Sequence, residues 1–265
     1  VDKIKEQLRK VIVGQDEFIE LLLVSLLADG HVLIEGVPGV AKTITAKLIA
    51  KTVDTIFNRI QFTPDLMPSD VLGTSVLNMK TSDFEFKKGP IFSNLVLIDE
   101  INRAELSRVF GELMYCLEYR GTDGKIKTQY AALNTKETGM LNIDGEYSFF
   151  VPHNVYIIAS MNTIDRSVDS FDFALRRRFK WEEVQPNMAL LRDHLKINYP
   201  KWIDLANNLE SLNNEIKNEL LLGKDYCIGH AYLWKLNYSN DKSLSYVRNQ
   251  IWNDSLGSLL EEYLR

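Results

Sequence analysis

Apolar residues recur along the chain in two patterns. Positions three and four residues apart predict helices, and short continuous apolar runs predict buried strands. The expected helices cover residues 2–12, 15–29, 43–53, 103–120 and 169–177. The expected strands cover residues 32–35, 95–98 and 155–159, with 59–62 as a further candidate strand and 179–184 as an edge strand. Because strands alternate with helices, the pattern predicts an α/β fold with a parallel sheet and right-handed crossovers.

Other segments depart from this alternation. Residues 74–88 and 125–150 alternate apolar and polar positions and contain turn-forming pairs, so we expect β-hairpin insertions there. After Pro186 the pattern is helical, without a convincing strand. We therefore expect an α/β core over residues 1–185 and a small all-α domain over residues 186–265.

Composition narrows the class of protein. The 265 residues include 31 Lys and Arg, 36 Asp and Glu, and 45% hydrophobic residues, which is typical of a globular chain. The net charge of −5 argues against a generally basic nucleic-acid-binding surface, although it allows a local basic patch. Two cysteines, Cys116 and Cys227, are too few for a disulfide scaffold or a Cys-rich zinc module.

The chain also lacks a membrane signal. The most apolar segment, Leu21–Ala28, is much shorter than the ~20 residues that a membrane helix needs. The first residues, Val1 to Lys5, have no apolar signal core. We therefore expect a cytoplasmic protein with no membrane segment.

A phosphate-binding loop is predicted between the strand at 32–35 and the helix that follows it. The segment Gly36-Val37-Pro38-Gly39-Val40-Ala41-Lys42-Thr43 has the glycines, lysine and threonine of such a loop. Lys42 would reach the β- and γ-phosphates, and the Thr43 hydroxyl would ligate Mg²⁺. Ala41 replaces the usual glycine and disfavours a left-handed backbone at that position.

Two carboxylates follow the apolar run at 95–98. In an open α/β sheet, ligands bind at the carboxyl ends of the strands, where Asp99 and Glu100 would lie. Asp99 would hold Mg²⁺ through water, and Glu100 would polarise the attacking water as a general base. Together with the loop, this pair predicts a nucleoside triphosphatase.

With both motifs present, the chain resembles the AAA+ nucleotide-driven motors. Resemblance to the MoxR branch lies in Val11–Gln15, Gly36–Thr43 and Arg59–Gly73. Resemblance to McrB-type restriction motors lies in Ser160–Ser167, Ala174–Phe179 and Ile228–Tyr232. The segment Asp99–Ala104 occurs in both branches. The chain is therefore similar to a MoxR/McrB-like AAA+ protein.

The resemblance implies further site residues. Asn162 matches the polar residue that orients the attacking water or touches the γ-phosphate. Arg177 and Arg178 match arginines that reach into the neighbouring subunit's site, where a guanidinium suits the charge on a transferring phosphoryl group. Arg103 is a second cross-subunit candidate, with a local salt bridge as the alternative. The expected nucleotide contacts are Val13, Gly14, Gly36, Val37, Pro38, Gly39, Val40, Ala41, Lys42, Thr43, Ile44 and His230.

The resemblance also implies an assembly and two classes of partner. It implies a ring, expected as a hexamer, in which hydrolysis of ATP or GTP remodels or translocates a partner. The MoxR branch implies ATP, a chaperone role and an adhesion-type metal-binding partner. The McrB branch implies GTP, a McrC-like nuclease subunit, and DNA engaged through pore loops or through that partner. The alternative is a slow-hydrolysing nucleotide-gated scaffold, which the departure at Ala41 leaves open.

Overall fold

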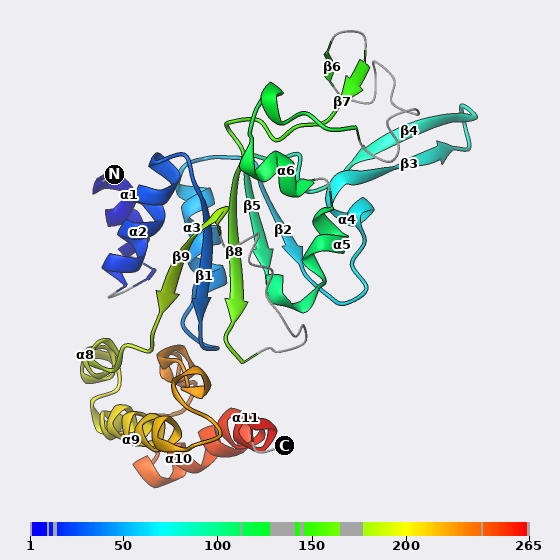
Figure 1. Cartoon of the computed structure of the whole chain (residues 1–265). Coiled ribbons are helices and arrows are strands. Elements are labelled where there is room, and N and C mark those ends of the chain that lie inside the picture. The colour runs from blue at the N-terminus through cyan, green and yellow to red at the C-terminus, as the bar shows by residue number, and fades with distance from the viewer. Residues whose placement is uncertain are drawn as a thin grey trace.

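The computed structural model of the chain confirms an α/β fold built on a parallel sheet. It describes residues 2–9, 11–12, 15–111, 113–127, 141–143, 146–164, 177–239 and 241–263. The 5-stranded sheet has the order β2-β5-β8-β1-β9, and every pairing within it is parallel. The strands are β1 (His31–Gly36), β2 (Phe57–Gln61), β5 (Leu95–Asp99), β8 (Tyr156–Asn162) and β9 (Phe179–Val184). Their carboxyl ends point toward the helical bundle in Figure 1.

Helices cover both faces of the sheet because alternate residues of each strand point to opposite sides. In β1, Val32 and Ile34 pack into the core on one face, and Leu33 packs into the core on the other. The first core is closed by α1 (Asp2–Arg9), α2 (Asp16–Leu27) and α3 (Lys42–Thr52). The second is closed by α4 (Pro68–Leu72), α5 (Leu106–Phe110) and α6 (Leu113–Glu118).

The single helix expected over 103–120 is wrong. The chain instead forms a short 3₁₀ turn, η1 (Ile101–Arg103), before α5 and α6. Ala104 is extended and Gly111 has a φ of 44°, so neither residue continues a right-handed helix. The sequence pattern recognised the buried face, which includes Leu106 and Leu113, but not these two interruptions. The helix expected over 169–177 lies outside the described residues, apart from its last position.

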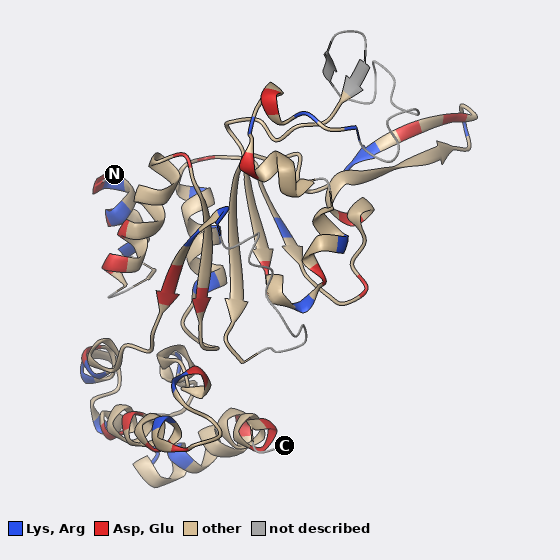
Figure 2. Cartoon of the chain, viewed as in Figure 1, with Lys and Arg blue, Asp and Glu red and all other residues tan. Residues whose placement is uncertain are grey.

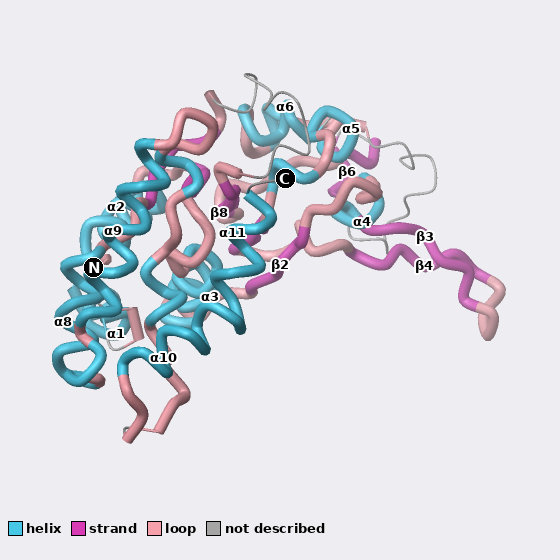
Figure 3. The backbone as a smooth tube through the Cα atoms, turned by 90° about the horizontal axis from the view of Figure 1, so that it is seen from below, coloured by secondary structure: helices cyan, strands magenta, loops and turns pink. Residues whose placement is uncertain are grey.

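Two strand pairs occur within the segments that we expected as insertions. β3 (Gly73–Asn78) and β4 (Asp83–Lys88) form an antiparallel hairpin that projects far from the sheet (Figures 1 and 3). Charges of both signs lie along β4 (Figure 2). After the 3₁₀ turn η2 (Thr122–Gly124), β6 (Leu141–Ile143) pairs with β7 (Glu146–Ser148).

The last part of the chain is helical, and no strand occurs in its described residues beyond Val184. Its own apolar core gathers residues between Leu191 and Leu256 around the buried Trp202. The elements are α8 (Met188–Asn198), η4 (Pro200–Trp202), α9 (Asp204–Asn218), η5 (Lys224–Tyr226), η6 (His230–Leu233), α10 (Leu244–Ile251), the π-helical turn η7 (Trp252–Leu256) and α11 (Gly257–Tyr263). Among the described helices, none has the length and apolarity to cross a membrane.

Candidate functional site

The loop between β1 and α3 has backbone geometry suited to an anion. Its turn brings backbone N–H groups and the start of α3 together, and a helix start carries partial positive charge. Gly39 has a φ of 78°, and a Cβ atom there would lie 2.7 Å from ring carbons of Tyr232. Ala41 has a φ of 61° and a ψ of 25°, so the loop keeps the left-handed conformation that alanine disfavours.

The strained alanine gives a stability prediction. Ala41→Gly should raise the free energy of unfolding by ~1 kcal/mol, because glycine adopts a left-handed conformation without a Cβ clash. Urea denaturation measures this difference. The matched control is Ala189→Gly on the exposed face of α8, which should lower the free energy of unfolding by roughly 0.5–1 kcal/mol. A lower stability for Ala41→Gly would contradict strain at this position.

Lys42 is held in place by carbonyl oxygens. Its side chain begins in α3, and its Nζ atom donates to the Gly36 carbonyl at 2.6 Å and the Val37 carbonyl at 3.2 Å. Nζ also lies 2.8 Å from Oδ1 of Asn162, at the end of β8. Lys42 is only 8% exposed. These three acceptors hold the largely buried ammonium group inside the loop, where it could contact a phosphate.

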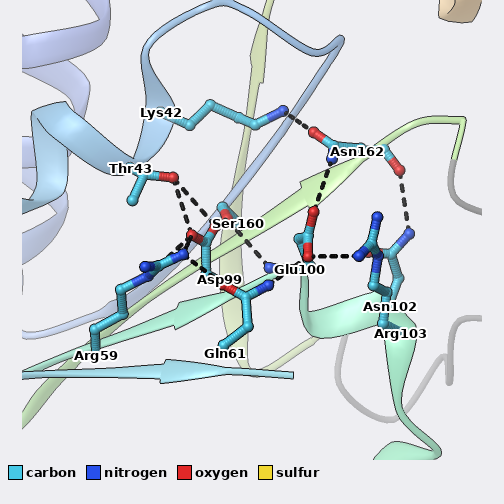
Figure 4. A network of polar contacts seen from close by, with 10 residues as sticks. All are labelled: Lys42, Thr43, Arg59, Gln61, Asp99, Glu100, Asn102, Arg103, Ser160 and Asn162. Atoms are coloured by element: carbon cyan, nitrogen blue, oxygen red, sulfur yellow. Dashed lines mark hydrogen bonds and ion pairs between the residues drawn. The ribbon is translucent and has the colours of Figure 1, made fainter. Parts of the chain in front are cut away.

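Two hydroxyl groups from separate elements converge on Asp99. The Thr43 Oγ1 atom lies 3.2 Å from both carboxylate oxygens of Asp99, and Ser160 Oγ donates to Oδ1 (Figure 4). Hydroxyl and carboxylate oxygens are the ligands that Mg²⁺ prefers, so Thr43 and Asp99 fit this cation. In the described part of the chain, no group of three or more His, Cys, Asp and Glu side chains could hold a metal alone. Thr43 and Asp99 would supply two of the ligands of such a cation, and phosphate oxygens and water would supply the others.

Glu100 sits directly after β5 with a φ of 56°, in the left-handed region that is rare for this residue type. Its Oε2 atom accepts from Gln61 Nε2 and lies 3.0 Å from Arg103 Nη1. Its Oε1 atom lies 3.5 Å from Asn162 Nδ2 (Figure 4). The structure thus brings Glu100 and Asn162 together beside Lys42, on neighbouring strand ends.

A cavity of about 770 Å³ lies over these groups. A volume of this size lies within the range typical of small-molecule sites. Its walls come from the start of the chain, the phosphate loop, three strand ends and the helical domain. They include Val11, Ile12, Gln15, Pro38, Gly39, Val40, Ala41, Lys42, Thr43, Ile44, Arg59, Gln61, Asp99, Glu100, Asn162, His230, Ala231, Trp234 and Lys235.

The helical domain contacts the phosphate loop through its backbone. The N–H of Gly229 donates to the Pro38 carbonyl at 3.0 Å, and the N–H of Ala231 donates to the Gly39 carbonyl at 2.9 Å. A side chain at Gly229 would not fit, because its Cβ atom would lie 2.2 Å from the Gly39 oxygen. The segment Ile228–Tyr232, which resembles McrB-type motors, is therefore hydrogen-bonded to the phosphate loop.

His230 is buried between the two parts of the site. Burial lowers the pKa of His230 to about 4, so the imidazole is neutral near pH 7. Its Nδ1 atom accepts from the N–H of Asn187 at 3.1 Å, which places the ring proton on Nε2. Nε2 lies 3.4 Å from Nε2 of Gln15. His230 thus connects Asn187, at the start of α8, to Gln15 in the cavity wall.

The two predicted arginines differ in exposure. The side chain of Arg178 is 8% exposed, and its Nη2 atom lies 2.6 Å from Oε2 of Glu118. The side chain of Arg177 is 64% exposed, with Nη2 at 3.1 Å from the same oxygen. Arg103 forms the local pair with Glu100 that was the alternative to a cross-subunit role. Arg177 therefore offers the more accessible guanidinium to another chain.

Several cavity residues were absent from the predicted set. Gln15, Arg59 and Gln61 line the cavity, and Ser160 binds Asp99. Arg59 and Gln61 lie two residues apart on the expected strand at 59–62, so their side chains share a face. Pairing this strand with the strand at 95–98 would have placed both side chains near Asp99. Two predicted contacts, Val13 and Gly14, lie outside the described residues.

Two family models match separate parts of the chain. Residues 31–123 match the ATPase family associated with various cellular activities (AAA). Residues 204–265 match the McrB alpha-helical lid domain. A crystal structure of a protein from Cytophaga hutchinsonii, assigned as an ATPase, superposes with a TM-score of 0.54 at 26% identity. That alignment covers 94% of this chain and 62% of the other.

Curated relatives come from both branches. The chaperone MoxR1 of Mycobacterium tuberculosis is 38% identical over 60% of this chain and 37% of its own length. The EcoKMcrB subunit of the type IV methyl-directed restriction enzyme of Escherichia coli K12 is 32% identical over 92% of this chain and 56% of its own length. YeaC of Bacillus subtilis is 38% identical over 66% of this chain and 51% of its own length. The chain thus spans about half the length of these relatives or less.

Proposed function

The chain belongs to the MoxR/McrB-like AAA+ ATPases, and from this premise we propose that it hydrolyses the bond between the β- and γ-phosphates of a nucleoside triphosphate. The observation that carries the proposal is the convergence of Lys42, Asp99, Glu100 and Asn162 on one cavity. A cation, a metal-binding carboxylate, a base and an amide are the groups that in-line attack of water needs. We further propose a boundary near residue 185 between the α/β core and a lid.

Binding comes first in the proposed mechanism. The N–H groups of the phosphate loop and the start of α3 hold the phosphate chain, and Lys42 neutralises its β- and γ-oxygens. Thr43 and Asp99 would hold Mg²⁺, which supplies further neutralisation of phosphate charge when it is bound. The contacts from Gly229 and Ala231 to the loop carbonyls favour an orientation in which the loop N–H groups face the phosphates.

Hydrolysis then depends on two side chains. Glu100 accepts a proton from the attacking water, and Asn162 orients that water through its amide. Asn162 also contacts Lys42, so this one residue connects the ammonium group that binds phosphate to Glu100, the base. Both side chains lie at the carboxyl ends of neighbouring strands, so the sheet sets their positions relative to the phosphates. This arrangement favours turnover over the alternative of a slow-hydrolysing scaffold.

The substrate base separates the two branches, and we propose ATP, with GTP as the alternative. The test is steady-state phosphate release by the full chain with each nucleotide at matched concentrations, with and without Mg²⁺. We expect Mg²⁺-dependent release with a higher kcat/KM for ATP. A higher kcat/KM for GTP would favour the restriction-motor branch, and no release with either nucleotide under assembly conditions would favour the scaffold. Mass measurements in each nucleotide would test the proposed hexameric ring.

Arg177 is proposed to complete the site of the neighbouring subunit. Arg177→Ala should lower turnover of the assembly by at least ~100-fold, because an arginine supplied in trans stabilises charge in the transition state. Nucleotide affinity of the separate chain should not change. Mixing this variant with Glu100→Gln chains should restore activity, because a mixed interface combines an intact base with an intact arginine. Arg178→Ala is the comparison, since its burial against Glu118 predicts a loss of stability instead.

Partners are proposed at the level of class. The relatives are a chaperone and a restriction subunit, so the target is either a protein to be remodelled or DNA delivered with a nuclease subunit. The projecting β3–β4 hairpin carries Lys80, Lys87 and Lys88 and is the described element best placed to contact a partner (Figure 2). Removing residues 74–87 should abolish stimulation of hydrolysis by such a partner and leave basal hydrolysis intact.

A further inference from the structure

A guanidinium group lies at the carboxylate that would face the cation. Arg59 Nη2 lies 2.6 Å from Oδ2 of Asp99, and Arg59 Nε donates to the same oxygen at 3.1 Å. The opposite oxygen, Oδ1, accepts from Ser160, and Thr43 lies 3.2 Å from both oxygens. Asp99 therefore has a positively charged partner on the neighbouring strand β2 (Figure 4).

Strand pairing brings this arginine to the site. β2 and β5 are parallel neighbours, with Gln61 opposite Asp99 and Arg59 opposite Leu97. Residues two apart in a strand share a face, so Arg59 and Gln61 both extend over the end of β5. The side chain of Arg59 is 50% exposed, whereas that of Asp99 is 9% exposed. Arg59 can therefore move into solvent while Asp99 stays in place.

The same arginine is connected to the base. Arg59 Nη2 donates to Oε1 of Gln61, and Nε2 of Gln61 donates to Oε2 of Glu100. The Gln61 amide thus has both of its polar atoms occupied, one by Arg59 and one by Glu100. If Arg59 leaves, Oε1 of Gln61 loses its donor, and the amide is free to rotate away from Glu100.

We propose that Arg59 is a positioning residue that competes with the nucleotide-bound divalent cation for Asp99. The inference rests on the proposed function, because it requires a cation that arrives with a nucleoside triphosphate. A guanidinium and a divalent cation repel each other at one carboxylate, so the cation displaces Arg59 from Asp99. Displacement then releases Gln61 and, with it, one of the contacts that hold Glu100. Binding of the cation at Asp99 thereby increases the mobility of the Glu100 side chain.

The test measures metal affinity instead of turnover. Mn²⁺ is titrated into the full chain saturated with a non-hydrolysable ATP analogue, and free Mn²⁺ is followed by electron paramagnetic resonance. Arg59→Met removes the charge and retains an unbranched side chain. We expect it to bind Mn²⁺ about fivefold more tightly than the wild type, the scale of a partly exposed ion pair. Arg59→Lys, which keeps the charge and loses the planar fork, should lie between the two.

Arg9→Met is the matched control, because Arg9 also forms an ion pair with an aspartate, Asp16, and neither residue lines the cavity. It should leave Mn²⁺ affinity unchanged. Nucleotide affinity measured in EDTA shows that each variant is folded. If Arg59→Met binds the analogue normally but binds Mn²⁺ equally or more weakly than the wild type, the competition is overturned while the proposed function stands. If the wild type binds neither ATP nor GTP analogues, the proposed function fails, and this inference fails with it.

Discussion

Glu100→Gln should lower the rate of phosphate release by about 10²- to 10⁴-fold while nucleotide binding is retained. The amide has nearly the same size as the carboxylate but cannot accept a proton from water at neutral pH. Because Glu100 lies after β5 and not in the phosphate loop, its replacement leaves the N–H groups and Lys42 in place. Loss of the negative charge also reduces repulsion of the phosphates, so affinity should be equal or higher.

Two measurements check this result on the full chain. Coupled phosphate release gives kcat, and anisotropy of a fluorescent nucleotide gives Kd. Glu105→Gln is the matched control. Glu105 is an exposed glutamate that directly precedes α5 and does not line the cavity. It should behave as the wild type in both measurements. Wild-type turnover by Glu100→Gln would exclude Glu100 as the base.

Lys42→Met should produce the largest loss of binding. Lys42 has a largely buried ammonium group, and a hydrogen bond to a charged group contributes about 1.5–3 kcal/mol. The variant should therefore bind nucleotide roughly 10- to 100-fold more weakly. The fold should persist, because methionine fills similar space and no buried charge is left unpaired by the change.

Thermal unfolding separates binding from folding. At a nucleotide concentration of about 100 times the wild-type Kd, binding stabilises the wild type by ~2.7 kcal/mol, and a 100-fold weaker variant gains only ~0.4 kcal/mol. The nucleotide-induced shift in Tm should therefore largely disappear in Lys42→Met. Lys47→Ala, an exposed lysine on the same helix, should keep the full shift. An unchanged shift for Lys42→Met would remove Lys42 from the phosphate site.

Much of the architecture was predictable because it depends on local spacing. Continuous apolar runs predicted the three central strands β1, β5 and β8, since a strand covered on both faces has no polar side. The two edge strands, β2 and β9, were expected although they also carry polar residues. The glycine-rich loop and Asp99–Glu100 were predictable because each motif directly follows a central strand. The helix over 103–120 was not predicted correctly, because the interruptions at Ala104 and Gly111 leave the apolar spacing almost unchanged.

Side chains that act through distant partners were harder to predict. Arg59 and Gln61 have polar character that equally suits a solvated strand edge, and only their pairing beside Asp99 shows what they contact. Arg177 and Arg178 are adjacent and identical in type, so the sequence does not distinguish them. The position of Glu118 does, because it buries one guanidinium and leaves the other exposed.

The sequence by itself determined the elements of this protein and the chemistry at their ends, because hydrophobic period and turn residues act over a few neighbouring positions. Only the tertiary structure decided how those ends combine. The sheet order inserts β8 between β5 and β1, which places Asn162 within reach of both Lys42 and Glu100. That order depends on packing between segments more than 50 residues apart, which no local pattern encodes.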